Sequence, residues 1–168
     1  MKIFYYNKAK NHTQNDTDQL IKESLNGYLG KEISVQIKRT SAGKPYLPGY
    51  PLHIGVTHTD DIVLIAISEK PFGVDCESID RTVNRLNRIA EKYYSENERA
   101  YVFDKNTDNA ERSRRFLEIW VKKEAYVKFT GEGLSAISKC DVMSLCGFKL
   151  IENRNNLLIY IYEEDKHE

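Results

Sequence analysis

The sequence lacks paired cysteines and any surplus of charge of one sign. Its three cysteines, Cys76, Cys140 and Cys146, are odd in number and have no CxxC spacing, which argues against a disulfide framework or a zinc site. Twenty-five basic and twenty-five acidic side chains cancel, so no global field attracts nucleic acid or an anionic membrane. We therefore expect reduced thiols, no nucleic-acid partner, and only local binding of anions.

Long apolar runs are absent as well. The first residues, Met1–Lys8, hold no run long enough for a signal peptide, and no later run is long enough to span a bilayer. No repeat, low-complexity tract or long linker divides the 168 residues. These absences predict a cytoplasmic protein with no membrane partner, folded as one compact domain or as two small halves that share a core.

The sequence does contain a strong helix pattern at Phe116–Phe129. Glu, Lys, Ala and Leu dominate it, no Gly or Pro interrupts it, and Gly131 follows where a left-handed C-terminal cap would lie. Trp120, Glu124 and Lys128 recur every four residues and so share one face of the helix. By itself this spacing fits either a surface ion pair between Glu124 and Lys128 or a functional site.

Apolar alternation and turn residues predict further elements around this helix. Strands are expected at Ile3–Tyr6, Ser34–Lys38, Ile62–Ile67 and Val74–Ser78, and in a hairpin of Phe148–Glu152 and Leu157–Tyr162. A first helix is expected at 18–29, with Asp16 or Thr17 as its cap, and a second from Asp80 to about Tyr94. A third would begin at the capping box Ser95–Glu98 and end at Phe103, and the central helix would begin near Ala110. We also expect a turn at Thr57–Asp61, strand character past Gly133, and a charged tail, Glu163–Glu168, that frays.

Two carboxylates stand out on the predicted strand Val74–Ser78. Asp75 and Glu77 project from the same face because side chains of a strand alternate with period two. They repel each other unless a cation lies between them, and oxygen ligands without histidine or thiolate suit Mg²⁺. A metal site and an edge strand with a solvated acidic face are equally good interpretations of this pair alone.

Two loops carry cationic side chains. Ser41–Pro45 places Lys44 between Gly43 and Pro45, and a plain turn with an exposed lysine is the favoured interpretation of that loop alone. His58 lies between Thr57 and Thr59, and histidine and hydroxyl groups bind phosphate oxygens well. A lone histidine beside a strand is more often structural.

A basic stripe is predicted on the helix that follows Asp80. Arg81, Arg85, Arg88 and Lys92 form it, and they lie opposite an apolar side made of Val83, Leu86, Ala90 and Tyr93. Such a stripe is usually a solvated face, but it also suits an acidic helix of a partner.

Together these segments resemble the 4′-phosphopantetheinyl transferase family, which converts apo carrier proteins to their holo forms with coenzyme A. Three carboxylates suited to Mg²⁺, with lysines and a histidine for phosphate oxygens, also fit phosphoryl chemistry. The resemblance rests on four motifs in family order: Gly43-Lys44-Pro45, Thr57-His58-Thr59, Gly73-Val74-Asp75-Cys76-Glu77 and Trp120-Val-Lys-Lys-Glu-Ala-Tyr-Val-Lys128.

The resemblance implies a role for each catalytic residue. Asp75, Glu77 and Glu124 would hold Mg²⁺, or Mn²⁺, against the pyrophosphate of coenzyme A. Glu124 would also help deprotonate the carrier serine. Lys128 would neutralise the pyrophosphate and the leaving 3′,5′-ADP, and Lys123 would steady the transferred phosphate.

It also implies how coenzyme A binds. Thr57 and His58 would contact its phosphates, and Gly43, Lys44 and Pro45 would cradle the adenine. The basic cluster that larger members use for the 3′-phosphate has no clear counterpart, so Lys38, Arg39 and Lys44 remain alternatives.

The implied architecture is an α+β fold of two pseudo-symmetric halves, each a small antiparallel sheet packed with helices. Residues 1–52 would form a reduced N-terminal half and residues 53–168 the half with the metal site, in one compact unit. Trp120 would pack the central helix against the sheet, and Cys76 would lie in the core. We expect a monomer whose partner is an apo acyl or peptidyl carrier protein, docked on the basic stripe.

Two other functions remain open at this point. Carboxylates with a Glu-x₃-Lys pair also suit a Mg²⁺-dependent nuclease, although zero net charge argues against it. A non-catalytic module that binds a carrier protein or coenzyme A is the second alternative, and the presence of all three carboxylates argues against it.

Overall fold

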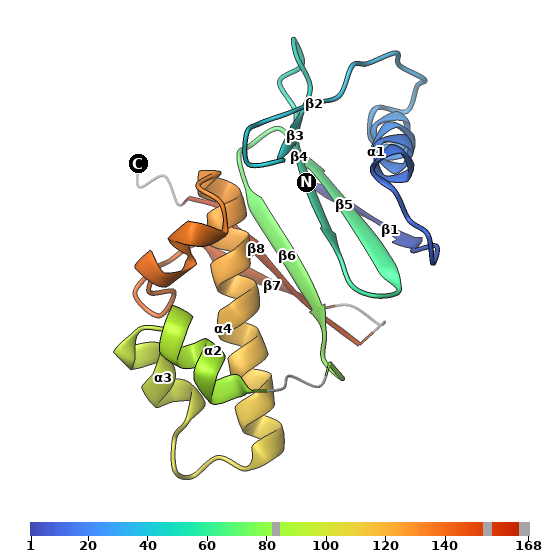
Figure 1. Cartoon of the computed structure of the whole chain (residues 1–168). Coiled ribbons are helices and arrows are strands. Elements are labelled where there is room, and N and C mark those ends of the chain that lie inside the picture. The colour runs from blue at the N-terminus through green and yellow to red at the C-terminus, as the bar shows by residue number, and fades with distance from the viewer. Residues whose placement is uncertain (82–84, 153–155, 165–168) are drawn as a thin grey trace.

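The computed structural model, which describes residues 1–81, 85–152 and 156–164, is an α+β fold with two antiparallel sheets (Figure 1). Within these residues, the larger sheet has the strand order β1-β5-β4-β3-β2 and the smaller sheet the order β6-β8-β7. The strands are β1 (Lys2–Asn7), β2 (Lys38–Arg39), β3 (Pro45–Tyr46), β4 (His53–His58), β5 (Ile62–Ser68), β6 (Gly73–Ser78), β7 (Phe148–Glu152) and β8 (Leu157–Tyr162). The predicted α+β class is confirmed.

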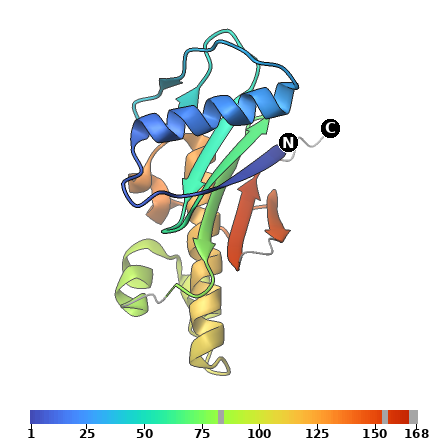
Figure 2. The same cartoon turned by 90° about the vertical axis from the view of Figure 1, so that its right-hand side faces the viewer.

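The helices of the described residues flank these sheets. They are α1 (Gln14–Leu29), α2 (Leu86–Tyr93), α3 (Glu96–Val102), α4 (Asn109–Thr130) and a short 3₁₀ helix, η1 (Leu134–Lys139). Helix α1 lies across one face of the larger sheet, and α4 runs along the smaller sheet (Figures 1 and 2). The order of layers is therefore α1, larger sheet, smaller sheet and α4.

Strand β5 shows why this layering forms. Its side chains are buried on both faces: Val63, Ile65 and Ile67 pack against Ile21 and Leu25 of α1. On the other face, Leu64 and Ala66 pack against residues of the smaller sheet, namely Phe72, Val74, Cys76, Leu157, Ile159 and Ile161. A continuous apolar run is what a strand buried on both faces requires. Cys76 lies in this core, as predicted.

Helix α4 has well-defined ends. At its start, the Asp108 side chain accepts a hydrogen bond from the Glu111 amide. At its end, Gly131 adopts a left-handed conformation with φ of 75°, as predicted for the cap. Leu117 and Val121 pack against Leu158 and Tyr160 of β8, so α4 covers the smaller sheet.

Strand β6 and helix α4 approach each other closely at Gly73. A β-carbon placed on Gly73 would lie 1.9 Å from the Ala125 carbonyl oxygen and 2.6 Å from the Phe129 amide nitrogen. Only glycine permits this contact, because those atoms belong to helix backbone and cannot move aside. The contact fixes the strand that carries Asp75 against the helix that carries Glu124.

Five predicted elements differ from the structure. Helix α1 begins at Gln14 rather than residue 18, because Thr13 and Asp16 form a capping box. Residues 34–37 form no strand, although Val35 and Ile37 still pack into the α1 core. Thr57 and His58 belong to β4 rather than to a turn.

The other two differences concern helices. Helix α2 begins at Leu86 rather than after Asp80, with Arg85 in a left-handed conformation before it. The chain past Gly133 forms η1 before it returns to strand character at β7. Arg81 and Arg85 thus precede the helix, so the prediction that all four basic residues lie on one helix is wrong. All four are exposed.

Three predictions reach residues outside the described part of the chain: Val83, the hairpin turn at 153–155, and the end of the tail at 165–168. The boundary between residues 52 and 53 and the monomeric state stay predictions. The larger sheet contains strands from both sides of residue 52, because β5 pairs with β4, which begins at His53, and also with β1 near the N-terminus.

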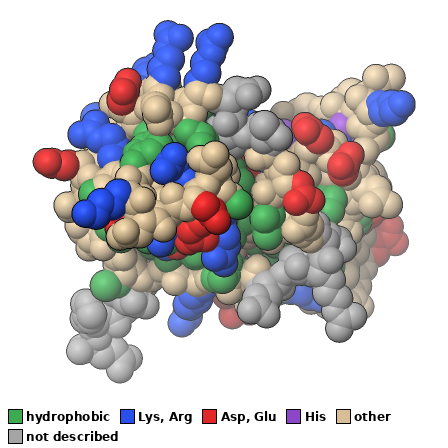
Figure 3. All heavy atoms as spheres, turned by 90° about the horizontal axis from the view of Figure 1, so that it is seen from below, with side chains coloured by type: hydrophobic (Ala, Val, Ile, Leu, Met, Phe, Trp, Pro, Cys, Tyr) green, Lys and Arg blue, Asp and Glu red, His purple; other side chains and the backbone are tan. Residues whose placement is uncertain are grey.

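On the face seen from below, basic and acidic side chains are interspersed, so charge of neither sign dominates there (Figure 3). Within the described ranges, no helix is both long and apolar enough to cross a membrane.

Candidate active site

A cleft of about 550 Å³ lies where β4, β6, α4 and the loop before β3 meet. Every residue assigned to catalysis, coenzyme A or metal from the sequence lines this cleft, with the single exception of Lys123. Segments more than 80 residues apart in the chain, at Lys44 and Lys128, therefore contribute to one site.

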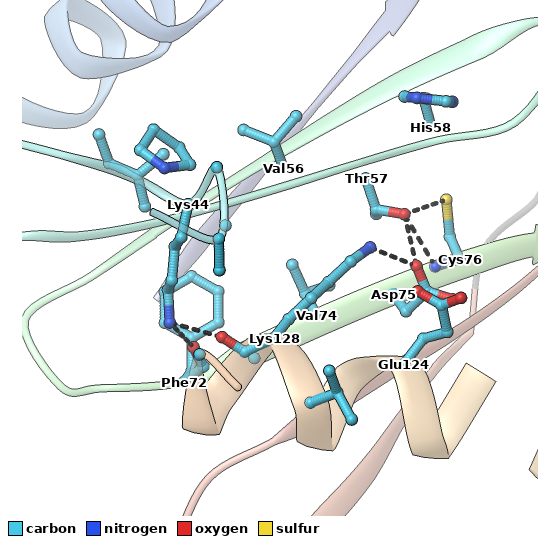
Figure 4. Close-up of a pocket in the computed structure, with 18 of the residues that line it drawn as sticks. Lys44, Val56, Thr57, His58, Phe72, Val74, Asp75, Cys76, Glu124 and Lys128 are labelled. Carbon is cyan, nitrogen blue, oxygen red and sulfur yellow. Dashed lines mark hydrogen bonds and ion pairs between the residues drawn. The ribbon is translucent and has the colours of Figure 1, made fainter. Parts of the chain in front are cut away.

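Asp75 is the centre of the hydrogen bonding in the cleft (Figure 4). Its Oδ1 receives a hydrogen bond of 2.8 Å from the Thr57 hydroxyl and forms an ion pair of 2.6 Å with the Lys128 ammonium. The Thr57 hydroxyl also accepts a hydrogen bond of 3.3 Å from the Cys76 amide. Thr57 thus orients Asp75, and a donor contact from this hydroxyl to a phosphate would require the Asp75 bond to break.

Lys128 remains charged in this environment. Burial lowers the pKa of Lys128, but the charge and hydrogen bond of Asp75, together with the charge of Glu124, raise it further, so the net shift is upward. A permanent cation at this position suits the neutralisation of phosphate oxygens.

The pKa values of the two glutamates of the cleft, Glu77 and Glu124, are raised, so both bind a proton more readily than a free glutamate. Burial and the nearby charges of Asp75 and Glu77 raise the pKa of Glu124 to about 7. Burial also raises the pKa of Glu77, against the opposing effect of its ion pair with Arg81. Two buried carboxyl groups with raised pKa values beside the Asp75 carboxylate form a site that a cation would stabilise.

The carboxylates do not already form a metal cage. Among the described residues, no three acidic, histidine or cysteine side chains are gathered closely enough to hold a metal ion as they stand. Asp75 is turned to Lys128 and Glu77 to Arg81, so each of these carboxylates is paired with a cation of the protein. The donors are all oxygens, which suits Mg²⁺ or Mn²⁺ once those ion pairs open.

Lys44 has a defined structural role. Its ammonium donates hydrogen bonds to the carbonyl oxygens of Lys128, at 2.7 Å, and Phe72, at 3.3 Å. It therefore ties the loop to the C-terminal turn of α4, where a cation also interacts favourably with the helix dipole. The interpretation as a plain turn with an exposed lysine is wrong.

Lys123, which the resemblance implies to be catalytic, does not line the cleft, so the structure gives no support for that role. The side chain is fully buried and forms an ion pair of 2.8 Å with Glu98 of α3, which is also fully buried. It donates further hydrogen bonds to the carbonyl oxygens of Ile137 and Cys140. An ammonium with three protons and three acceptors has none left for a phosphate.

Trp120 does not pack against the sheet as predicted. Its ring lies 5.9 Å from that of Tyr93 on α2 and 6.5 Å from that of Phe116. It therefore joins α4 to α2 and does not line the cleft.

Some residues of the site have no clear signal in the sequence. Gln14, Thr17 and Arg39 line the cleft beside the Ala42–Pro45 loop. Arg39 was one of three alternatives for the 3′-phosphate, and it forms an ion pair with Asp18. Gln14 and Thr17 belong to the first turn of α1, which lies beside the cleft. No local sequence pattern reveals this long-range contact.

The chain is similar in sequence to one family of known proteins. The family model described as the 4′-phosphopantetheinyl transferase superfamily matches residues 71–166. The chain is 28% identical to the 4′-phosphopantetheinyl transferase gsp of Aneurinibacillus migulanus over 127 residues, which is 76% of this chain and 48% of that protein.

Two further relatives show the same partial coverage. The 4′-phosphopantetheinyl transferase Sfp of Bacillus subtilis is 27% identical over 133 residues, 78% of this chain and 57% of its own length. The transferase HetI of Nostoc is 26% identical over 129 residues, 73% of this chain and 53% of its own length. The chain thus spans about half the length of the curated relatives that it matches.

Proposed function

The chain belongs to the 4′-phosphopantetheinyl transferase superfamily, and from this membership we propose that it modifies an apo carrier protein with coenzyme A. A serine oxygen of an acyl or peptidyl carrier attacks the β-phosphorus of coenzyme A. The new bond joins serine oxygen to phosphorus, and the bond from that phosphorus to the bridging oxygen breaks. The products are a phosphodiester on the carrier and 3′,5′-ADP, and the serine proton passes to a base.

One observation carries this proposal. Asp75, Glu124 and Lys128 line one cleft, and all three lie in the segment that matches the superfamily. Two acids and a charged lysine around a cleft of this size suit the transfer of a phosphoryl group, because such catalysis depends on positioning and charge stabilisation.

We assign the metal to the three carboxylates. Asp75, Glu77 and Glu124 supply oxygen donors only, and the raised pKa values of both glutamates support a site that favours added positive charge. Mg²⁺ bound there would neutralise pyrophosphate oxygens as charge develops.

Glu124 and Lys128 then have distinct roles. Glu124 accepts the serine proton, directly or through water, as the general base. Lys128 stays protonated beside the cleft and stabilises the negative charge of the leaving 3′,5′-ADP.

We assign the 3′-phosphate of coenzyme A to Arg39. Of the three alternatives, Lys38 does not line the cleft, and Lys44 is committed to two carbonyl oxygens. Arg39 lines the cleft, and its guanidinium has five N–H donors, so its contacts with Asp18 and the Gly43 carbonyl oxygen leave donors for a phosphate.

Comparison of coenzyme A with its dephospho form tests Arg39. Arg39→Ala should lower kcat/KM for coenzyme A by about tenfold or more but change it little for dephospho-coenzyme A, because only the former carries the phosphate. Lys38→Ala is the matched control and should change neither value. Equal losses with both substrates in Arg39→Ala would contradict the assignment.

The proposed reaction itself is tested by mass spectrometry. Candidate apo carriers are incubated with the protein, coenzyme A and Mg²⁺, and the gain of one phosphopantetheine on a single serine is the expected result. Asp75→Asn and Glu124→Gln should abolish the gain and keep the fold, whereas the exposed control Glu69→Gln should retain it. Normal transfer by Asp75→Asn, or transfer that is unaffected by chelators, would overturn the metal assignment.

A further inference from the structure

Lys8 lies just after β1, and its position is fixed by the hairpin of β4 and β5. Its backbone amide donates a hydrogen bond of 2.7 Å to the Asp61 carbonyl oxygen, in the turn between these strands. Its ammonium donates a hydrogen bond of 3.0 Å to the Thr59 carbonyl oxygen. Lys8 is thus fixed beside the end of β4 both by its backbone and by the tip of its side chain.

The same ammonium lies 3.3 Å from Nδ1 of His58. An ammonium has protons to donate and no lone pair, so Nδ1 must be the acceptor in this hydrogen bond. A neutral imidazole that accepts at Nδ1 carries its proton on Nε2. The geometry therefore selects one of the two neutral tautomers.

The charges around His58 favour the neutral ring. Partial desolvation and the charges of Lys8 and Lys128, with a smaller effect from His12, lower the pKa of His58, and only Asp75 opposes them. Protonation would also place an N–H group against the ammonium of Lys8. His58 is therefore a hydrogen-bond donor through Nε2 without being a cation.

From this geometry we propose that Lys8 is a positioning residue, which holds His58 as the Nε2–H tautomer so that it donates a hydrogen bond to a phosphate oxygen of coenzyme A. The identity of the ligand rests on the proposed function: His58 lines the cleft, and the family resemblance implies that it contacts the phosphates of coenzyme A. Lys8 itself does not line the cleft and acts through the imidazole.

The tautomer can be measured without any ligand. In long-range ¹H–¹⁵N correlation spectra of histidine-labelled protein, the native His58 ring should show the Nε2–H pattern, with its signals assigned by their loss in His58→Gln. Lys8→Met removes the donor and should give a mixture of tautomers and a higher pKa for His58. Lys8→Arg keeps a cationic donor and should restore the native pattern.

The matched control is Lys10→Met, which removes one positive charge two residues away from an exposed side chain. It should leave the His58 spectrum unchanged. A native spectrum in Lys8→Met would overturn the proposal, as would an equal change in Lys10→Met.

Binding of coenzyme A, measured by calorimetry, gives the functional consequence. Lys8→Met should weaken binding by about three- to tenfold, Lys8→Arg much less, and Lys10→Met not at all. In a His58→Gln background, Lys8→Met should have little further effect. An undiminished effect in that background would mean that Lys8 acts by charge alone and would overturn the positioning role.

The two measurements separate this inference from the proposed function. If the native protein binds no coenzyme A while Lys8→Met still changes the His58 tautomer, the proposed function fails and the positioning of His58 by Lys8 stands. If coenzyme A binds and the tautomer is insensitive to Lys8, the positioning fails and the proposed function stands.

Discussion

At the scale of single residues, Lys123 and Lys128 show how two lysines of one helix acquire different roles. Lys128 reaches Asp75 in the cleft, whereas Lys123 is fully buried against Glu98 and two carbonyl oxygens. Five positions along an α-helix correspond to a rotation of about 140°, which directs the two side chains to different neighbours. The motif reveals both lysines, but only the packing around α4 distinguishes them.

The buried pair gives a prediction for stability. Lys123→Met should lower the free energy of unfolding by about 3–5 kcal/mol, because it leaves the buried Glu98 carboxylate without a positive charge to balance it. The double variant Lys123→Met/Glu98→Gln should recover much of this loss, and the exposed control Lys105→Met should lie within about 0.5 kcal/mol of the native value. Urea denaturation measures all three.

The same variants test the role of Lys123 in the reaction. Because its ammonium has no proton free for a substrate, the folded double variant should keep most of the native transfer rate. A double variant that is fully folded but inactive would restore the catalytic role of Lys123.

Glu124 gives a prediction for pH. Its pKa is raised from 4.5 to about 7 in the folded protein, so the folded state binds the proton more tightly than the unfolded state. The stability from this group is fully present below about pH 4.5 and is lost as pH rises toward 7. In a chelator, Glu124→Gln should therefore reduce the fall in unfolding free energy between pH 5 and 8.

The control for this experiment is Glu69→Gln, whose exposed carboxylate should leave the pH dependence unchanged. Mg²⁺ added at pH 8 should stabilise the native protein more than Glu124→Gln. Parallel pH profiles for the native protein and Glu124→Gln would show that Glu124 titrates normally.

At the scale of elements, the contact of β6 with α4 determines the geometry of the cleft. Gly73 permits the strand to touch the helix backbone, two residues before Asp75 and opposite the turn after Glu124. The distance between the two carboxylates therefore depends on a residue that has no side chain.

Replacement of this glycine tests the contact. Gly73→Ala should destabilise the fold by about 1–3 kcal/mol or more, since the new methyl group overlaps with atoms of the helix backbone. In Gly27→Ala the new β-carbon would lie 3.1 Å from a Phe4 side-chain atom. That change should be within about 1 kcal/mol of neutral, because alanine favours the helix of which Gly27 is part. Thermal denaturation compares the two, and equal stabilities would contradict the role of Gly73.

At the scale of the whole molecule, the site joins the two sheets. Thr57 and His58 come from the larger sheet and Asp75 from the smaller sheet, so neither sheet forms the site alone. Under the proposed function a carrier protein would approach this junction from outside, and the exposed basic residues around the start of α2 are its predicted docking surface.

Charge reversal tests the docking surface. Arg85→Glu/Arg88→Glu should raise KM for the carrier by about fivefold or more and leave KM for coenzyme A unchanged, since acidic carriers would be repelled. Lys105→Glu, in the exposed loop before α4, is the control for net charge and should change neither constant. Unchanged KM values in the double variant would show that these arginines are only a solvated surface.

The sequence predicted the α+β class, most of the strands, the central helix and its cap. These features follow from local rules: period-two alternation in β6, helix-forming residues in α4, and a glycine at position 131 that accepts a left-handed conformation. It missed the true start of α1 because the capping box at Thr13 precedes the apolar stripe by several residues.

The sequence by itself determined which acids and lysines are available and which of them share a face of one strand or helix. Only the tertiary structure decided that Lys123 is buried, that the Thr57 hydroxyl binds Asp75, and that Lys8 reaches His58. The physical reason is that periodicity acts over a few residues, whereas a side chain's partners come from segments up to 84 residues away that packing brings together.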